Sequence, residues 1–227
     1  NTTMHNTLIV GGTKGIGLAI SNLLSQENCI IFSRSDYNPS SATHHHLKVD
    51  VTHDELPELE NIQNIIYCPG SINLKPFGSL KEEDFMNDHQ VNFMGAVKVI
   101  KKYFRQMSKV ENANIILFSP VAVTQGMPFH ASISSAKGAI EGLTRSLAGE
   151  FAGKIKVNCV APTLTNTPLA SGILRNEEAV KRSNERHPTK RINNAEDVAK
   201  AALLLLNDHN MTGQILHVDG GLSSLKI

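Results

Sequence analysis

Along this chain, short uninterrupted apolar runs alternate with longer stretches in which apolar residues recur at helical spacing. The runs are rich in β-branched and aliphatic residues, and helical stretches separate several of them. Continuous apolar runs are typical of strands buried on both faces of a parallel sheet. The pattern therefore predicts an α/β protein with seven strands, at residues 7–10, 29–32, 46–49, 64–67, 114–118, 154–160 and 214–218.

Four stretches carry apolar residues at helical spacing. In the fourth, Glu196 and Asp197 fall in the first turn, where the helix dipole favours acidic side chains. The predicted helices cover residues 16–26, 80 to about 108, 131–151, and a segment that starts near residue 195.

Two connections are short, and the first of them is too rich in turn residues for a full helix, whereas the second holds Pro57 in its only candidate helix. Residues 34–45 hold Pro39 with several turn formers, and residues 54–61 hold Pro57. We therefore expect one edge of the sheet to be thinly covered on one face. His44, His45 and His46 lie in this region and are interpreted as a solvated loop rather than a metal site, because no acidic or cysteine ligand accompanies them.

Composition fits one domain over residues 1–227, with 41% hydrophobic residues and a net charge of +1. That charge gives no general attraction to nucleic acid or to an anionic membrane. The start "NTTMHNTLIVGG" lacks the features of a signal peptide, and no apolar stretch is long enough to span a membrane. The three cysteines predict buried thiols, so we expect a soluble protein in the reducing cytoplasm.

A glycine-rich loop follows the first predicted strand. In "LIVGGTKGIGLAI", Gly11, Gly15 and Gly17 lie between that strand and the first helix. Backbone amides in such a loop can approach a pyrophosphate, and the helix dipole stabilises its charge. The GxxxGxG spacing differs from the commoner GxGxxG, so the prediction depends on the motifs that accompany it.

Six further motifs follow in a fixed order. Together with the glycine loop they resemble the short-chain dehydrogenase/reductase family over nearly the whole chain, nearest to the subgroup with 3-oxoacyl-(acyl carrier protein) reductases. The resemblance implies a seven-stranded, parallel, Rossmann-like sheet and a nicotinamide cofactor. The motifs are "VDV" (49–51), "YCPG" (67–70), "VNFMG" (91–95), "SAKGAIEGLTRSLAGEF" (135–151), "VNCVAPTLTNTP" (157–168) and the pair "DVAKAALLLL" (197–206) and "MTGQILHVDGG" (211–221).

The same resemblance implies which residues bind the cofactor. The family usually has two asparagines and an alanine where this chain has Tyr67, Cys68 and Pro69, so contacts to the cofactor are expected there through the backbone. It usually has a glycine where this chain has Thr163, so the path of that loop is expected to shift. The implied site comprises Gly11, Thr13, Lys14, Gly15, Ile16 and Gly17 at the pyrophosphate, Asp50 and Val51 at the adenine, Cys68, Pro69 and Gly70 at the adenosine ribose, Lys137 at the nicotinamide ribose, and Pro162, Thr165 and Thr167 near the carboxamide.

Two cations favour NADP(H) over NAD(H). Arg34 ends the second strand, where an NAD enzyme usually has an acid, and Lys14 precedes Gly15. Both suit a 2′-phosphate. Asp36 is a competing acid, and two ordinary surface cations are the alternative interpretation.

The family's proton donor is missing. In the family a tyrosine four residues before a lysine exchanges a proton with the substrate, a serine binds the substrate oxygen, and an asparagine holds a water relay. Taking Lys137 as the lysine puts Ile133 at the tyrosine and Pro120 at the serine. Only Asn92 and Lys137 of the catalytic set remain. Loss of a general acid costs roughly 10²- to 10⁴-fold in rate.

Few neighbours could replace that donor. His130 lies one turn before Ile133 and is a candidate acid. Ser119 and Ser134 are poorly aimed, and the three tyrosines, at positions 37, 67 and 103, lie far from this helix in the predicted topology.

The stretch of residues 163–192, named the lid segment, corresponds to the family's substrate lid. Between residues 175 and 191, six cations face three acids, a local charge of +3. An anionic ligand, such as a phosphopantetheine carrier or a coenzyme A thioester, would fit this charge, and a solvated mobile lid is the alternative.

Two functions stay open from the sequence. The first is an NADP(H)-dependent oxidoreductase that acts on a small-molecule carbonyl, alcohol or acyl thioester with an atypical proton source, such as water held by Asn92 and Lys137. The second is a catalytically silent NADP(H)-binding protein that acts as a sensor, scaffold or partner subunit. The resemblance also implies a homodimer or homotetramer through the helices at about 80–108 and 131–151.

Overall fold

Seven parallel strands form one sheet in the computed structural model, which describes residues 5–226. Residues 1–4 and residue 227 lie outside the described residues. The expectation about a signal peptide concerns residues 1–12 and therefore falls partly outside them. The strand order is β3-β2-β1-β4-β5-β6-β9. The strands are β1 (Asn6–Val10), β2 (Cys29–Ser33), β3 (His44–Lys48), β4 (Ile62–Tyr67), β5 (Ala113–Phe118), β6 (Ile155–Pro162) and β9 (Ile215–Val218).

Strand order reverses at β1, which pairs with β2 on one side and with β4 on the other. In an open parallel sheet, a crevice forms at such a reversal, outside the carboxyl ends of the strands. The fold thus fixes where a ligand site is expected, and the predicted α/β class and seven-stranded sheet are confirmed.

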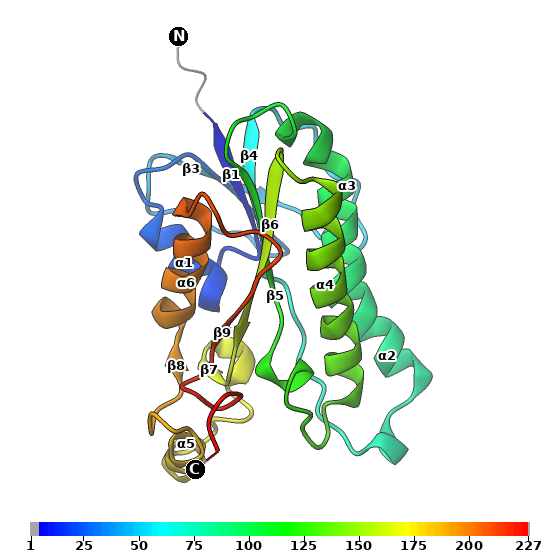
Figure 1. The fold of residues 1–227 in the computed structure, drawn as a ribbon, viewed down its shortest axis with the longest axis vertical. Coiled ribbons are helices and arrows are strands. Elements are labelled where there is room, and N and C mark those ends of the chain that lie inside the picture. The colour runs from blue at the N-terminus through cyan, green and yellow to red at the C-terminus, as the bar shows by residue number, and fades with distance from the viewer. Residues whose placement is uncertain (1–4, 227) are drawn as a thin grey trace.

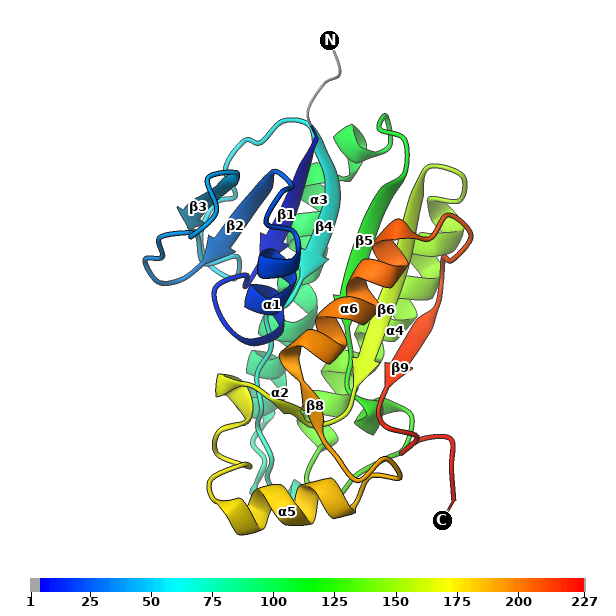
Figure 2. The ribbon, with the colours of Figure 1, turned by 90° about the vertical axis from the view of Figure 1, so that its left-hand side faces the viewer.

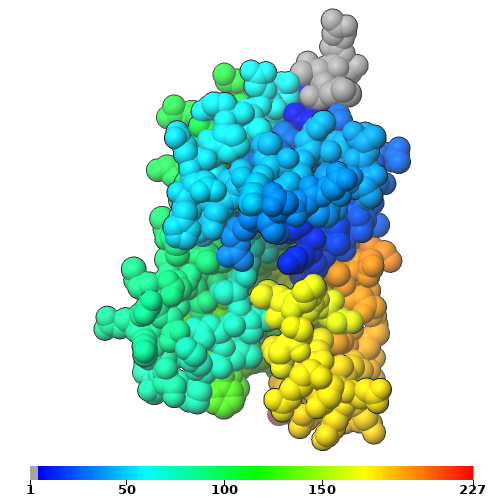
Figure 3. Space-filling model, turned by 180° about the vertical axis from the view of Figure 1, so that it is seen from behind, coloured from blue at the N-terminus to red at the C-terminus, as the bar shows by residue number. Residues whose placement is uncertain are grey.

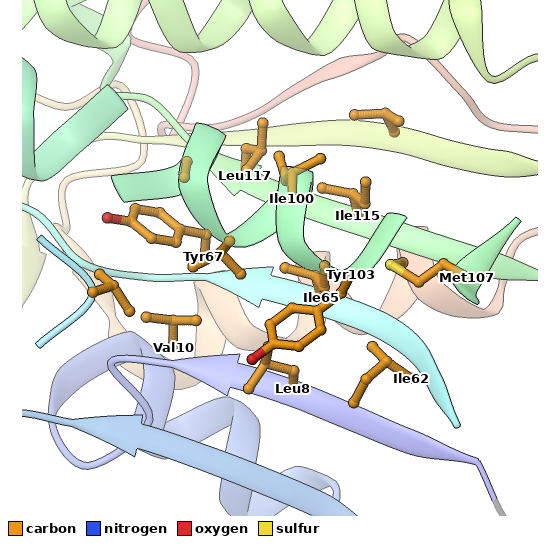
Figure 4. Close-up of a cluster of buried hydrophobic side chains, with 14 of the residues drawn as sticks. Leu8, Val10, Ile62, Ile65, Tyr67, Ile100, Tyr103, Met107, Ile115 and Leu117 are labelled. Atoms are coloured by element: carbon orange, nitrogen blue, oxygen red, sulfur yellow. The ribbon is translucent and has the colours of Figure 1, made fainter. Parts of the chain in front are cut away.

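Helices cover both faces of the sheet (Figure 1). One apolar cluster packs α3 and α4 on one face, and a second packs α1 and α6 on the other. Figure 4 shows the first cluster, in which Tyr67 and Tyr103 lie among aliphatic side chains. The helices are α1 (Gly15–Leu23), α2 (Glu82–His89), α3 (Gly95–Met107), α4 (Ala131–Glu150), α5 (Glu177–Glu185) and α6 (Ala195–Asn207).

The single helix expected over residues 80 to about 108 is interrupted. A π-helical turn, Gln90–Met94, separates α2 from α3. The Tyr67 hydroxyl donates a hydrogen bond to the Val91 carbonyl oxygen at 2.7 Å. A Cβ on Gly95 would lie 2.1 Å from the Tyr67 hydroxyl oxygen, so this position requires glycine. π-Helical turns are often found at functional sites.

The prediction of a solvated loop at the three histidines was wrong. They form the start of β3 and pair with β2. The His44 ring is buried, with its nitrogens 3.2 Å from Ser21 Oγ and 3.1 Å from the Leu24 carbonyl oxygen. The rings of His44 and His46 find hydrogen-bond partners on neighbouring elements, which the local sequence does not reveal. Residues 34–43 contain no helix, as predicted, and the candidate helix in residues 54–61 does not form.

The lid segment is more ordered than the sequence suggested. It contains α5 and a two-stranded parallel ladder of β7 (Thr165–Asn166) and β8 (Asn193–Asn194). The Asn176 side chain caps α5 by accepting a hydrogen bond from the Ala179 amide at 2.8 Å. Figure 2 shows α5 lying across one end of the molecule, away from the sheet. Within the described chain, no helix is both long enough and apolar enough to cross a membrane.

Candidate functional site

The glycine loop packs tightly between β1 and α1. A Cβ on Gly17 would lie 2.2 Å from the Gly11 carbonyl oxygen, so only glycine permits this approach. At the start of α1 no side chain caps the helix, and its first turn holds no acid. The first amides of a helix lack partners within it, so this end of α1 is suited to bind an anion.

Three segments that are distant in sequence meet at this loop. A Cβ on Gly11 would lie 3.3 Å from Pro69, and one on Gly15 would lie 3.3 Å from Thr167. The glycine loop therefore contacts both the turn after β4 and the start of the lid segment. Of the residues that the resemblance assigned to the cofactor, one continuous cavity wall contains Ile16, Cys68, Gly70, Lys137, Pro162, Thr165 and Thr167.

Arg34 directly follows β2, and Lys14 directly precedes α1 in the glycine loop. Lys14 and Arg34 are exposed. Asp36, the competing acid, lies 3.0 Å from the Lys48 ammonium, whose hydrogen bond lowers the pKa of the Asp36 carboxyl. The Asp36 carboxylate is therefore already paired with a cation on β3, whereas Lys14 and Arg34 form no ion pair among the described residues.

Asp50 and Val51 sit in the turn after β3. The Asp50 carboxylate accepts hydrogen bonds from the Thr52 amide at 2.9 Å and the Thr52 hydroxyl at 2.5 Å, and Val51 is buried. Asp50 thus shapes the turn that would border an adenine.

Lys137 is buried on α4, with 8% of its surface exposed. Burial lowers the pKa of its ammonium to about 8, although the thiols of Cys159 and Cys68 act in the opposite direction. All three cysteines are free; Cys29 and Cys159 are buried as predicted, and Cys68 is half-buried in the cavity wall.

Asn92 and Lys137 converge at Gly70. A Cβ on Gly70 would lie 3.4 Å from Asn92 Oδ1 and 3.9 Å from Lys137 Nζ. The Asn92 side chain is fully buried in the π-helical turn, and its Nδ2 donates hydrogen bonds to Ser71 Oγ at 2.8 Å and to the Asp88 carbonyl at 2.7 Å. The two residues that the family resemblance assigned to the catalytic set therefore both lie close to Gly70.

Ile133 and Pro120 both line the same cavity. Neither side chain carries a proton that a substrate oxygen could take. Ser119, next to Pro120, donates its hydroxyl to Glu141 Oε1 at 2.8 Å, and Ser134 lies 3.4 Å from the Ala122 carbonyl. Both hydroxyls are thus directed to partners within the fold.

Among the other candidate proton donors, two tyrosines lie in the core and one histidine lies at the cavity. The hydroxyls of Tyr67 and Tyr103 donate to the carbonyls of Val91 and Pro57, each at 2.7 Å, so both are used in the core. His130 lines the cavity, and its Nδ1 lies 2.7 Å from the Pro128 carbonyl. Because a carbonyl only accepts, this nitrogen is the donor, and Nε2 is the atom left for a ligand.

The cavity has a volume of about 520 Å³ and lies between the start of α4 and the lid segment. Figure 3 shows the lid residues, in yellow, facing the cyan-to-green residues across an opening. Most of the wall is apolar, which suits a ligand with an apolar body. Its apolar residues include Ile72, Leu74, Val121, Met127, Phe129, Ile133, Leu164, Leu169 and Ile173.

Of the six cations counted in the lid segment, one lines the cavity. Arg186 lines the wall, but Arg191 forms a two-pronged ion pair with Asp197, at 2.8 and 3.1 Å. His187 is buried, with Nε2 2.8 Å from Thr163 Oγ1 and Nδ1 2.7 Å from the Ser183 carbonyl. The local positive charge is therefore concentrated at the cavity in one side chain, Arg186.

Sequence reasoning missed three polar residues of this wall, Ser71, Ser183 and His187. Ser71 directly follows the "YCPG" motif, and this adjacency was the only available signal. No local pattern distinguishes His187 from an ordinary lid residue, because Thr163 reaches it only through the fold.

Known proteins resemble this chain over nearly its whole length. The family described as enoyl-(acyl carrier protein) reductase matches residues 11–223. Carbonyl reductase family member 4 of Danio rerio is 32% identical over 96% of this chain and 98% of its own length. The 3-oxoacyl-(acyl-carrier-protein) reductase of Bos taurus is 30% identical over 94% of this chain and 96% of its own.

Solved structures agree with the observed fold. ElxO with NADP bound superposes with a TM-score of 0.88 at 27% identity, covering 98% of this chain and 100% of ElxO. The ligand-free aldohexose dehydrogenase of Thermoplasma acidophilum has the same TM-score at 24% identity, covering 98% of this chain and 95% of its own. By its sequence matches and its fold, this chain belongs to the short-chain dehydrogenase/reductase family.

Proposed function

We propose that this chain binds NADP(H) and transfers hydride between the nicotinamide and a carbonyl or alcohol substrate, using a proton source other than the family's tyrosine. The convergence of Asn92 and Lys137 at Gly70, in the wall of a cavity that also reaches Thr167 beside the glycine loop, carries this proposal. These residues would hold the nicotinamide end of the cofactor, which supplies the hydride chemistry when bound.

NADP(H) is favoured over NAD(H) by the charges at the end of β2. Lys14 and Arg34 are exposed and without ion-pair partners among the described residues, while Lys48 neutralises Asp36. A 2′-phosphate would gain two cations there. The similarity to ElxO, whose structure holds NADP, supports the same choice.

The substrate that fits best has an apolar body and an electrophilic carbonyl. Apolar side chains form most of the cavity wall, and Arg186 supplies one cation at its lid side. An acyl thioester combines these features, with an anionic carrier outside the apolar part. The names of the bovine and zebrafish relatives, a 3-oxoacyl reductase and a carbonyl reductase, agree with this class.

A catalytically silent NADP(H)-binding protein is the second candidate. It is favoured by the apolar side chains of Ile133 and Pro120 at the cavity, where the family has its proton donor and oxygen ligand. Such a chain would act as a sensor, a scaffold or the partner of an active relative.

We further propose that the chain works as a homodimer or homotetramer through the helices at about 80–108 and 131–151, following the family. The free thiols of Cys29, Cys68 and Cys159 support work in a reducing compartment such as the cytoplasm.

NADPH oxidation over a panel of ketones and 3-oxoacyl thioesters separates the two candidates. Binding is checked first by thermal unfolding, since NADPH at 100 times its dissociation constant should add about 2.7 kcal/mol of stability. We expect turnover above the buffer rate that Lys137→Ala abolishes. Stabilisation by NADPH with no turnover of any panel member would favour the silent protein, and no stabilisation would reject both candidates.

A further inference from the structure

A buried carboxylate lies behind the cavity wall. Asp88, near the end of α2, is 3% exposed. Its Oδ1 accepts a hydrogen bond from Ser71 Oγ at 2.5 Å, and its Oδ2 accepts one from Ser132 Oγ at 2.6 Å. No cation forms an ion pair with Asp88 within residues 5–226, so two serine hydroxyls satisfy this carboxylate. Burying a carboxylate without a cation is costly, so its presence calls for a role.

The two serines differ in their access to the cavity. Ser71 is half-buried and lines the cavity, whereas Ser132 is fully buried and does not line it. Ser71 Oγ also accepts a hydrogen bond from Asn92 Nδ2 at 2.8 Å. A serine hydroxyl has one donor and two acceptor positions, so one acceptor position of Ser71 remains for a ligand.

Lys137 also lies near Ser71. Gly70 directly precedes Ser71. A Cβ built on Gly70 would lie 3.9 Å from Lys137 Nζ and 3.4 Å from Asn92 Oδ1. A buried ammonium near a substrate oxygen stabilises negative charge that develops there. Asn92 holds the Ser71 hydroxyl from one side and Asp88 accepts its hydrogen bond on the other, so its orientation is fixed before a ligand enters.

We propose that Ser71 and Asp88 are the proton-transfer pair of this site, with Ser71 as the catalytic residue and Asp88 acting through it. This inference rests on the proposed oxidoreductase function. In alcohol oxidation, the substrate O–H bond breaks and its proton bonds to Ser71 Oγ, while the Ser71 hydroxyl proton moves to Asp88 Oδ1. The O–H electron pair forms the carbonyl, and the C–H electron pair leaves as hydride, which reduces the nicotinamide.

Carbonyl reduction reverses each of these transfers. Protonated Asp88 then returns a proton to Ser71 Oγ as the Ser71 hydroxyl proton bonds to the substrate oxygen, and the nicotinamide is oxidised. The observed hydrogen bonds, with Ser71 donating to Asp88, match the state that is ready to accept a proton from an alcohol. The pair thus occupies the chemical role left by Ile133 without occupying its position.

Ser71→Ala and Ser132→Ala form a matched pair for the test, because each removes one hydroxyl from the same carboxylate. In the unliganded proteins we expect similar losses in the urea midpoint of unfolding, since each variant loses two hydrogen bonds. Ser71→Ala loses those with Asp88 and Asn92, and Ser132→Ala loses those with Asp88 and the Asp84 carbonyl. On a substrate that the wild type turns over, we expect Ser71→Ala to lower kcat by roughly 10²-fold or more while Ser132→Ala keeps most of the rate. Asp88→Asn should lower kcat similarly.

Three outcomes decide the matter. Selective loss in Ser71→Ala, with NADPH affinity unchanged, supports the pair. Equal rates in the wild type and Ser71→Ala, or equal losses in both serine variants, would overturn the pair and leave the oxidoreductase function standing. NADPH binding by the wild type with no turnover of any panel member would reject that function and the pair together.

Discussion

Ile133 lies one helical turn before Lys137 on α4, and both side chains line the cavity. An apolar side chain therefore occupies the position that the family resemblance assigns to the tyrosine. Ile133 is 5% exposed, so it fills this part of the wall closely. A larger side chain at this position has a cavity of about 520 Å³ into which it can extend.

Ile133→Tyr should restore an ordinary proton donor. Because Lys137 lies one turn further on, its ammonium favours the phenolate form of such a tyrosine. We expect kcat for a ketone to rise by roughly 10²-fold or more. Ile133→Phe, which adds the ring without the hydroxyl, is the control and should give no increase. Equal rates in the two variants would show that a tyrosine hydroxyl introduced at this position does not protonate the substrate.

Lys137 should make stability depend on pH. Its pKa is lowered by burial from 10.5 to about 8, so between these values the unfolded chain binds more protons than the folded one. Stability therefore rises with pH across this window, and the cost of the buried charge is fully present below about pH 8. Relative to Lys137→Met, the wild type should gain about 2 kcal/mol between pH 7 and pH 9.5.

Urea unfolding of both proteins at the two pH values checks this prediction. The comparison cancels the titration of groups that the two proteins share. A difference between them that does not change with pH would contradict the lowered pKa of Lys137.

Lys14→Ala and Arg34→Ala should each weaken NADPH binding by about tenfold, corresponding to roughly 1.4 kcal/mol, and leave NADH binding nearly unchanged. The reason is the loss of a cation beside the 2′-phosphate. Lys48→Ala is expected to shift preference toward NADH, because it frees Asp36 from the ion pair observed at 3.0 Å. Calorimetric titration with both cofactors measures these changes. Tighter binding of NADH than NADPH by the wild type would contradict the assignment.

Gly95→Ala should destabilise the fold through Tyr67. The added Cβ would lie 2.1 Å from the Tyr67 hydroxyl oxygen, which must then move away from the Val91 carbonyl. We expect a loss of roughly 1–3 kcal/mol from overpacking. Tyr67→Phe removes the clashing oxygen, so the double variant should lose less than the sum of the two single variants. Strict additivity in urea unfolding would rule out this coupling.

The sequence predicts the central sheet well because its strands are marked by continuous apolar runs. It predicts the edge strand β3 poorly, because His44 gains its partners from α1 and the residue after it only in the folded chain. The interruption between α2 and α3 is likewise invisible in the apolar period, since Tyr67 reaches Val91 from β4, across the core.

Some residues of the candidate site can likewise be predicted from the sequence, and others cannot. Residues carried by short motifs, such as Gly17 and Lys137, can be identified from local order and spacing. Asp88 could not, because an acid among polar residues of a predicted helix is normally exposed. Its burial depends on Ser71 and Ser132, which come from two other parts of the chain.

Transfer of deuterium from the reactive carbon of labelled NADPH to a carbonyl substrate tests most directly whether this chain is a catalyst. Mass spectrometry of the product alcohol detects the label even when turnover is slow. We expect one deuterium per product molecule with the wild type, and none above the buffer background with Lys137→Ala. NADPH binding without labelled product from any ketone or 3-oxoacyl thioester would contradict a catalytic role for this chain.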